Sequence, residues 1–87
     1  MIYTQKNISD NKFERTFSSD IPETELKWHK DKENRMVEVT EDTDWYFQMD
    51  NGLPIPLNKG VKLNIPKETY HRVIKGTGDL KIIIQEY

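Results

Sequence analysis

Apolar and polar residues alternate along this chain in short runs, with a period of two. In the second run, for example, Phe13, Arg15 and Phe17 share one face. Alternation of this kind is typical of β-strands that are buried on one side. Eight or nine short strands are predicted, over residues 2–8, 12–18, 26–29, 35–41, 45–49, 53–57, 61–65, 70–74 and 80–86. The pattern therefore predicts an all-β protein, built as a sandwich or barrel.

Turn-forming residues separate the predicted strands. The pair Asn51–Gly52 predicts a hairpin, because both residues tolerate a positive φ. Pro54 and Pro56 have no backbone N–H to donate, so residues 53–57 should form an edge strand or an irregular one. Residues 19–24 are the one candidate for a short helical turn, but they contain a proline and few apolar side chains, which favours a loop.

Length, composition and charge narrow the class of protein. A chain of 87 residues makes one domain around a single core. It has no cysteine, which excludes a disulfide-stapled protein and a cysteine-ligated metal site. The net charge is −2 and the charges are interspersed, so no nucleic-acid partner is expected. No apolar run spans a bilayer and no signal peptide is recognisable, so we expect a soluble, cytoplasmic protein without a membrane partner.

The two histidines of the chain suggest a site. His29 and His71 fall near the ends of predicted strands, where they can meet across a sheet interior. If the segment after His29 is extended, Asp31 and Glu33 point to the same side as that histidine. Two imidazoles and a carboxylate form the ligand set of a non-haem iron site, and zinc accepts the same donors. The sequence thus predicts a metal site of His29, Asp31 and His71, with Glu33 as the substitute carboxylate.

Residues 60–71 resemble the second sequence motif of the cupin superfamily. That motif runs glycine, five residues, proline, one residue, glycine, two residues, histidine. Gly60, Pro66 and His71 stand at the matching intervals. Glu68 departs from the motif, because a glycine is usual at its position.

Residues 29–42 resemble the first cupin motif less closely. That motif begins histidine, any residue, histidine, three or four residues, glutamate, six residues, glycine. With His29 at its start, Asp31 stands in place of the second histidine and Arg35 in place of the glutamate. Asp42 replaces the closing glycine at a predicted turn, where aspartate can adopt the left-handed conformation.

The resemblance covers residues 26–86 and implies that residues 1–87 form one small cupin-like domain, an RmlC-like β-barrel of the jelly-roll type. The chain also looks like short uncharacterised cupin-like proteins of marine tailed phages. The resemblance implies a divalent ion (Fe, Mn, Ni or Zn) held by His29, Asp31 and His71, and a small anionic substrate. It also implies a homodimer, since single-domain cupins commonly pair.

A second interpretation has no metal. In it, Arg35 and Gln48 join the two histidines in a polar pocket for a small anionic ligand, because a guanidinium can grip a carboxylate or phosphate with two hydrogen bonds. The domain could also serve only as a dimerising module. Arg35 favours this interpretation, because its charge repels a divalent ion unless Asp31 or Glu33 pairs with it. His71, within the second motif, favours the metal. Neither interpretation specifies a reaction.

Overall fold

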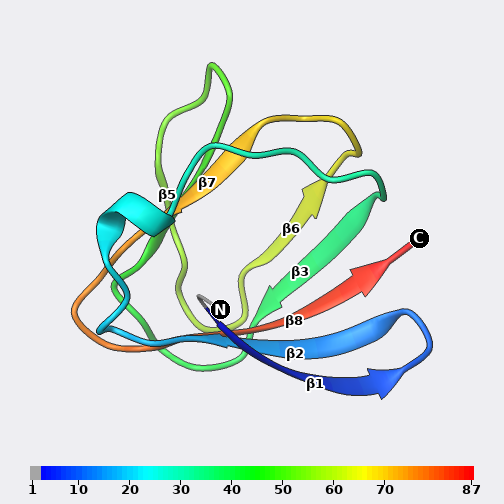
Figure 1. Cartoon of the computed structure of the whole chain (residues 1–87), viewed down its shortest axis with the longest axis horizontal. Coiled ribbons are helices and arrows are strands. Elements are labelled where there is room, and N and C mark those ends of the chain that lie inside the picture. Colours follow the sequence, from blue (N-terminus) through cyan, green and yellow to red (C-terminus); the bar gives the residue numbers. More distant parts are fainter. Residues whose placement is uncertain (1–2) are drawn as a thin grey trace.

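A computed structural model describes residues 3–87 of the chain. Within this range the chain forms eight β-strands and one turn of 3₁₀ helix, which agrees with the predicted all-β class (Figure 1). The strands are β1 (Thr4–Ser9), β2 (Lys12–Phe17), β3 (Arg35–Val39), β4 (Tyr46–Met49), β5 (Ile55–Pro56), β6 (Lys62–Ile65), β7 (His71–Ile74) and β8 (Leu80–Glu86). Ile2, the first residue of the first predicted strand, lies outside the described residues.

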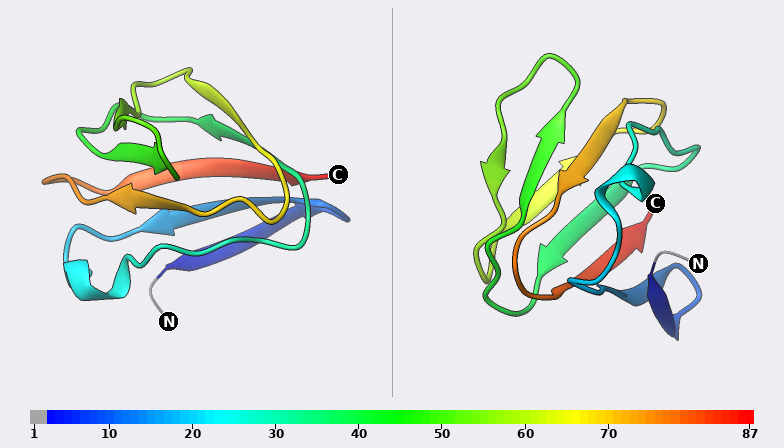
Figure 2. Two further views of the ribbon diagram at one scale, coloured as in Figure 1. Left: turned by 90° about the horizontal axis from the view of Figure 1, so that it is seen from above. Right: turned by 60° about the vertical axis from the view of Figure 1, so that its left-hand side comes forward.

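The strands form two antiparallel sheets that face each other. One sheet has five strands in the order β1, β2, β8, β3, β6, and the other has three in the order β5, β4, β7. Figure 2 shows β4, β5 and β7 grouped on one side of the molecule, with β8, β2 and β1 on the other. Consecutive positions of the strands that face the other sheet therefore point alternately into the space between the sheets and away from it, whereas all residues of β1 are exposed.

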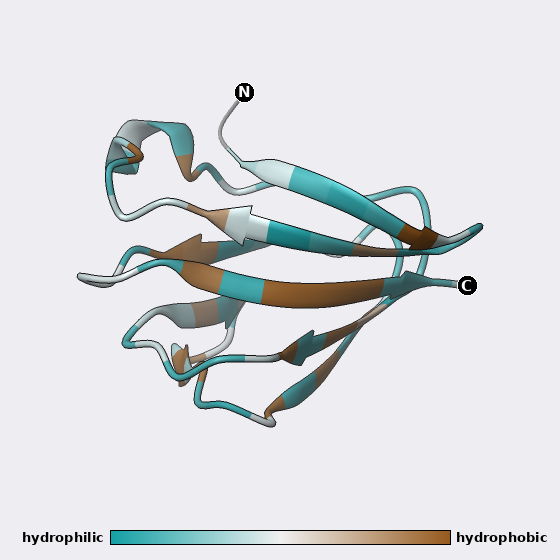
Figure 3. Cartoon of the chain, turned by 90° about the horizontal axis from the view of Figure 1, so that it is seen from below, coloured by the Kyte–Doolittle hydropathy of each residue, from teal (hydrophilic) through white to brown (hydrophobic). Residues whose placement is uncertain are grey.

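The core fills the space between the sheets, and the alternating pattern places its side chains there. On β8, the central strand of the larger sheet, Leu80, Ile82 and Ile84 are buried while the residues between them are more exposed. Figure 3 shows that this strand, which leads to the C-terminus, is apolar over most of its length. Trp45 is fully buried and its indole N–H donates to the carbonyl of Gly78 at 2.6 Å. The buried side chains form one cluster, so the described residues share a single core.

Two predicted elements need correction. Residues 26–29 do not form a strand, because only His29 pairs with another segment, through an isolated bridge to His71. Residues 19–24 were expected to be a loop, but a 3₁₀ turn spans Glu23–Glu25. The extended residues after this turn run beside β7 towards the start of β3, where Figure 1 shows them in cyan to teal.

The hairpin between β4 and β5 differs in detail from the expected one. The strands pair as an antiparallel hairpin, but residues 50–54 connect them in place of a two-residue turn. Asn51 alone of the Asn51–Gly52 pair has a positive φ, of 62°. The N–H of Gly52 donates to the carbonyl of Met49 at 3.0 Å, which closes a four-residue turn at this point. β5, which contains Pro56, is an edge strand, as the sequence predicts.

Glu68, which replaces the usual motif glycine, keeps a glycine-like backbone. Its φ is 60°, in the left-handed region that favours glycine. In this conformation its N–H donates to the carbonyl of Asp31 at 2.7 Å. Asp42 was expected to be able to adopt the same conformation, but it is not among the described non-glycine residues with a positive φ. The turn at Glu68 therefore adopts the left-handed conformation without a glycine.

Among residues 3–87, no helix is long and apolar enough to cross a membrane.

Replacing Glu68 with glycine should stabilise the fold, because glycine enters the left-handed region without the steric cost of a Cβ atom. Glu68→Ala is the matched control. Both variants lose the exposed ion pair of Glu68 with Lys30, at 3.3 Å, but alanine retains the Cβ. We expect Glu68→Gly to exceed Glu68→Ala by about 1 kcal/mol in the free energy of unfolding, measured with urea. Equal stability of the two variants would show that this turn is unstrained.

Candidate functional site

A backbone bridge brings the two histidines together. The N–H of His29 donates to the carbonyl of His71 at 3.0 Å, and the N–H of His71 donates to the carbonyl of His29 at 2.8 Å. Residues that pair directly across antiparallel strands project their side chains to the same face. The two imidazole rings consequently lie 4.4 Å apart, measured between ring centroids. The sequence-based expectation that His29 and His71 meet is confirmed.

Both imidazoles are held in the same orientation by backbone carbonyls. Nδ1 of His71 lies 2.8 Å from the carbonyl oxygen of Thr69, and Nδ1 of His29 lies 3.0 Å from that of Lys27. A carbonyl oxygen can only accept, so each Nδ1 carries the hydrogen. The lone pair of each neutral ring therefore resides on Nε2. A carbonyl partner at Nδ1 is the usual support of a histidine that ligates a metal through Nε2.

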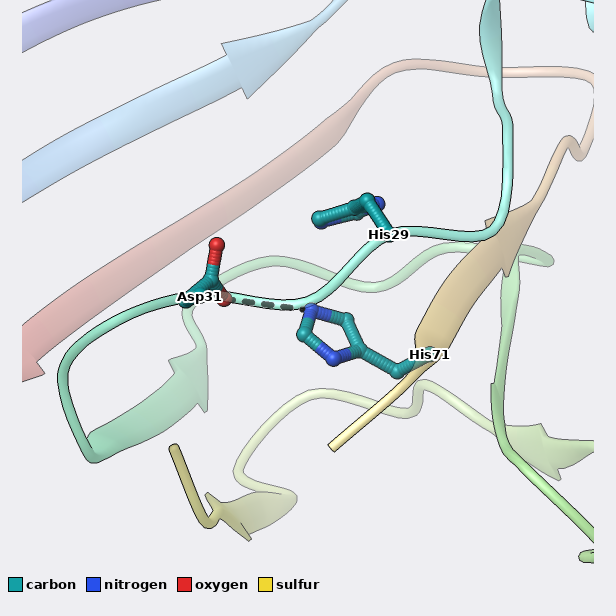
Figure 4. Close-up of side chains that lie close together, drawn as sticks. All are labelled: His29, Asp31 and His71. Atoms are coloured by element: carbon teal, nitrogen blue, oxygen red, sulfur yellow. Dashed lines mark ion pairs between the residues drawn. The ribbon is translucent and has the colours of Figure 1, made fainter. Parts of the chain in front are cut away.

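Asp31 faces the same point as the two rings (Figure 4). Its Oδ2 lies 3.3 Å from Nε2 of His71 and 3.3 Å from Nη1 of Arg35. Neither contact has hydrogen-bond geometry, and this buried oxygen accepts no hydrogen bond from the described residues. Donor atoms of His29, Asp31 and His71 all lie within 4.8 Å of one another. His71 is buried, Asp31 is half-buried and His29 is exposed, so the cluster lies at the mouth of the interior.

Glu86 partly neutralises Arg35, the residue that stands where the first cupin motif has a glutamate. Arg35 and Glu86 are direct partners on β3 and β8. Nε and Nη2 of Arg35 donate to Oε2 of Glu86 at 3.0 and 2.8 Å, leaving Nη1 next to Asp31. The guanidinium thus has a carboxylate on each side. Because Glu86 offsets the charge of Arg35, the carboxylate of Asp31 is not committed to Arg35 alone.

The cluster opens into a cavity of about 370 Å³, which has residues of both sheets in its lining. Apolar side chains make most of the wall, including Phe47 and Val73 from the smaller sheet and Ile82 from the larger one. Arg15 of β2 also reaches the cavity. A volume of this size lies near the lower end of the range for small-molecule sites.

Two predicted site residues lie elsewhere. Glu33 is exposed and outside the cluster, because the chain bends at residues 32 and 33 and interrupts the alternation. Gln48 does not line the cavity. Its side-chain amide accepts a hydrogen bond from Nε of Arg72 at 3.0 Å and donates to the carbonyl of Gly52 at 3.1 Å. Of the two predicted anion ligands, the structure therefore brings only Arg35 to the cavity.

Two further residues of this region were not predicted as site residues. Glu86 was not predicted because its pairing with Arg35 depends on the register of β3 against β8, which the sequence does not reveal. Arg15 had a visible signal, since it shares the inward face of β2 with Phe13 and Phe17. A charged residue between two inward aromatic positions is a departure from binary patterning that often marks a site.

Burial sets the charge state of His71. The pKa of His71 lies below its ordinary value of 6.5, mainly because burial disfavours the charged ring, and the nearby charges of His29 and Arg35 act in the same direction. The hydrogen bond to Thr69 and the charge of Asp31 oppose this lowering without cancelling it. The ring is therefore neutral at neutral pH. Nε2 then carries no hydrogen and lies 3.3 Å from the Asp31 oxygen, so two acceptor atoms are close together.

The fold is similar to that of several solved proteins. The cobalt(II) form of HppE in complex with Tris buffer superposes with a TM-score of 0.78 at 18% identity, over 98% of this chain and 53% of that one. Hydroxypropylphosphonic acid epoxidase from S. wedmorenis, in complex with fosfomycin, has a TM-score of 0.69 at 20% identity, over 87% of this chain and 42% of that one. An RmlC-like cupin from Shewanella frigidimarina has a TM-score of 0.70 at 12% identity, over 97% of this chain and 82% of that one.

These similarities establish the fold. The chain spans only 41 and 53% of the length of two HppE structures that it matches. No protein-family model and no curated protein matches the sequence. At identities this low, shared architecture carries no shared activity. The protein is all-β, with two antiparallel sheets in the cupin-like jelly-roll arrangement that the sequence predicts.

Stability of the metal-stripped protein should fall as pH drops below about 6.5. Because the pKa of His71 is lower in the folded chain than its ordinary value of 6.5, the unfolded chain binds more protons in this range. The contribution of the neutral His71 ring to the free energy of unfolding is complete above pH 6.5 and is lost as the pH falls towards the pKa of His71 in the folded chain. Urea unfolding between about pH 7.5 and 5 measures it. His71→Asn, whose amide can still donate to Thr69, should show a shallower decline, and an equal decline would contradict the assignment.

Proposed function

We propose that this chain is a small metal-binding domain, in which His29, Asp31 and His71 hold one divalent ion beside a cavity for a small anionic molecule. The single observation that carries the proposal is the pair of acceptors, Nε2 of His71 and Oδ2 of Asp31, that face each other without a hydrogen between them. Two such atoms repel each other, and a shared cation turns the contact into an attraction. A buried polar atom that accepts no hydrogen bond in a folded protein calls for an explanation of this kind.

The distances suit an ion. Two donors that bind the same ion at roughly 2.1 Å each lie about 3.0 to 3.5 Å apart. The contact between Nε2 of His71 and Oδ2 of Asp31, at 3.3 Å, falls in this range. The carbonyl partners at Nδ1 fix both rings for ligation through Nε2, so His29 can complete the set.

The donor set narrows the choice of ion. Two imidazoles and one carboxylate suit Fe, Mn, Ni or Zn and leave further coordination positions free. HppE, which has a similar fold, was solved with iron(II) and with cobalt(II). A bound ion would supply Lewis acidity or activate a bound water. The chain's own residues hold the donors, and the cavity beside them has a mostly apolar wall.

The metal-free alternative depends on Arg35 as an anion grip, and its contacts disfavour that role. Nε and Nη2 of Arg35 already donate to Glu86, and Nη1 lies beside Asp31. An anion would have to displace a carboxylate that is already in place. Arg35 therefore acts as an internal partner of Asp31 and Glu86, which removes the main support for a metal-free pocket at this residue.

Removing the carboxylate of Asp31 should abolish metal binding. Elemental analysis of protein purified without an affinity tag or chelator should find close to one ion per chain, and zinc titrated into the stripped protein should raise its unfolding temperature. Asp31→Asn retains the shape but not the charge, and should weaken zinc binding by at least about 100-fold. His71→Ala should have the same effect.

Glu33→Gln is the matched control, because it removes a neighbouring carboxylate that lies outside the cluster. It should bind zinc as tightly as the unmodified chain. Metal absent even after reconstitution, or equal affinity of Asp31→Asn and the unmodified chain, would overturn the proposal.

A further inference from the structure

Arg15 is a cation on the apolar inward face of the larger sheet. It lies between the buried residues Phe13 and Phe17 on β2, and its direct partner on β8 is the buried Ile82. Its side chain reaches the same cavity as the His29 cluster. Burial lowers the pKa of Arg15, although a guanidinium remains charged at any ordinary pH. A charge placed among apolar side chains destabilises the fold unless something compensates for it.

The direct contacts of the Arg15 guanidinium within the described chain are to neutral groups, while the carboxylates of Asp31 and Glu86 act on its charge only from a distance. Nε and Nη2 of Arg15 both donate to one oxygen, Oε1 of Gln5, at 3.2 and 2.9 Å. The guanidinium carbon lies 3.8 Å from the centre of the Tyr3 ring, over its face. Arg15 forms no ion pair with any described carboxylate, whereas Arg35 pairs with two. Arg15 thus keeps its full positive charge, and Nη1 has no hydrogen-bond acceptor among residues 3–87.

The charges around the cavity balance, but Arg15, unlike Arg35, makes no direct contact with a described carboxylate. The lining of the cavity carries three cations, Arg15, Lys27 and Arg35, and two carboxylates, Glu25 and Asp31. Glu86, outside the lining, is a third carboxylate and pairs with Arg35. Glu25 and Lys27 are exposed, where solvent screens them, so Arg15 supplies the unpaired charge on the inner wall.

Arg15 is also close to the metal-binding cluster. The guanidinium carbons of Arg15 and Arg35 lie 5.2 and 5.9 Å from the centre of the same Phe13 ring, so they are no more than about 11 Å apart. Arg35 in turn contacts Asp31. A small molecule in the cavity can therefore reach Arg15 and the cluster at the same time.

We propose that Arg15 binds the oxyanion group of a small organic acid, a carboxylate or a phosphonate, that occupies this cavity. The middle of the molecule is apolar, to suit the wall formed by residues such as Val73 and Ile82. Its other end carries an oxygen directed at His29, Asp31 and His71. This last point rests on the proposed metal site, whereas the Arg15 contact does not. On binding, the oxyanion accepts from Nη1 and can replace Gln5 as the acceptor of Nη2.

The test uses metal-stripped protein, in which the cluster offers no ion. Benzoate and phenylphosphonate are the probes, and neutral benzamide is the control of matching size. We expect the two anions to bind with about millimolar affinity and to shift the NMR signal of the Arg15 Nε–H group. Arg15→Gln should weaken anion binding by at least about tenfold and leave benzamide unaffected. Arg15→Lys should fall between them, because it retains the charge without the planar fork.

Arg72→Gln is the matched control variant. Arg72 packs over the Trp28 ring at 4.7 Å and does not line the cavity, so its replacement should leave anion binding unchanged. The proposal is overturned if neither anion binds, if Arg15→Gln binds as well as the unmodified chain, or if binding leaves the Arg15 signal unmoved. The signal is read on the unmodified chain, so the test stands even if Arg15→Gln fails to fold.

Glutarate, which has two carboxylates, separates this proposal from the metal site. With zinc present it should bind more tightly than benzoate, and His71→Ala should remove the advantage. If zinc does not bind while benzoate still depends on Arg15, the metal site is wrong and the anion contact stands. If zinc binds but glutarate has no advantage, a molecule that reaches both Arg15 and the cluster is ruled out. If zinc binds but no anion depends on Arg15, the metal site stands and the anion contact is wrong.

Discussion

The pairing of His29 with His71 is the interaction on which the site depends. Two backbone hydrogen bonds join these residues, and the N–H of Glu68 adds a third bond to the carbonyl of Asp31. These bonds fix a segment that belongs to neither sheet against the start of β7. Backbone groups that are satisfied in this way tolerate little movement, because each would lose its partner in a half-buried place. The direction of both rings and of the carboxylate follows from this pairing.

Electrostatics then decides what the three side chains can do. A histidine and an aspartate in contact normally form an ion pair, but burial keeps His71 neutral and its donor hydrogen points to Thr69. Arg35 could have bound Asp31 completely, yet two of its three nitrogens donate to Glu86. Neither His71 nor Arg35 thus donates a hydrogen bond to Oδ2 of Asp31, which remains a free acceptor within the cluster. Replacement of the motif's glutamate by a cation is compatible with a metal site because β8 supplies the compensating carboxylate.

The sequence predicted most of the fold and the centre of the site. Alternation identified strands that are buried on one face, such as β8, whereas the residues of β1 and β5 are all exposed. The two histidines met as expected. The failures have specific causes. Residues 26–29 alternate like a strand but pair through one residue, since sequence alone does not show where a partner strand ends. The chain bends at residues 32 and 33, so Glu33 is exposed and lies outside the cluster. The ion pair of Arg35 with Glu86 depends on the register of β3 against β8, which only the tertiary structure defines.

The His29–His71 bridge also determines when the site can exist. The two residues are 42 positions apart, from 29 to 71, and the bridge between them closes all the chain from β3 to β6 into a loop. Contacts of such sequence separation form slowly, because the entropy of a long loop must be lost before any of them stabilises the chain. No local fragment of the chain can assemble the three donors. The three side chains are therefore brought together only once the chain from β3 to β6 has closed, and a chain without this closure has no assembled cluster.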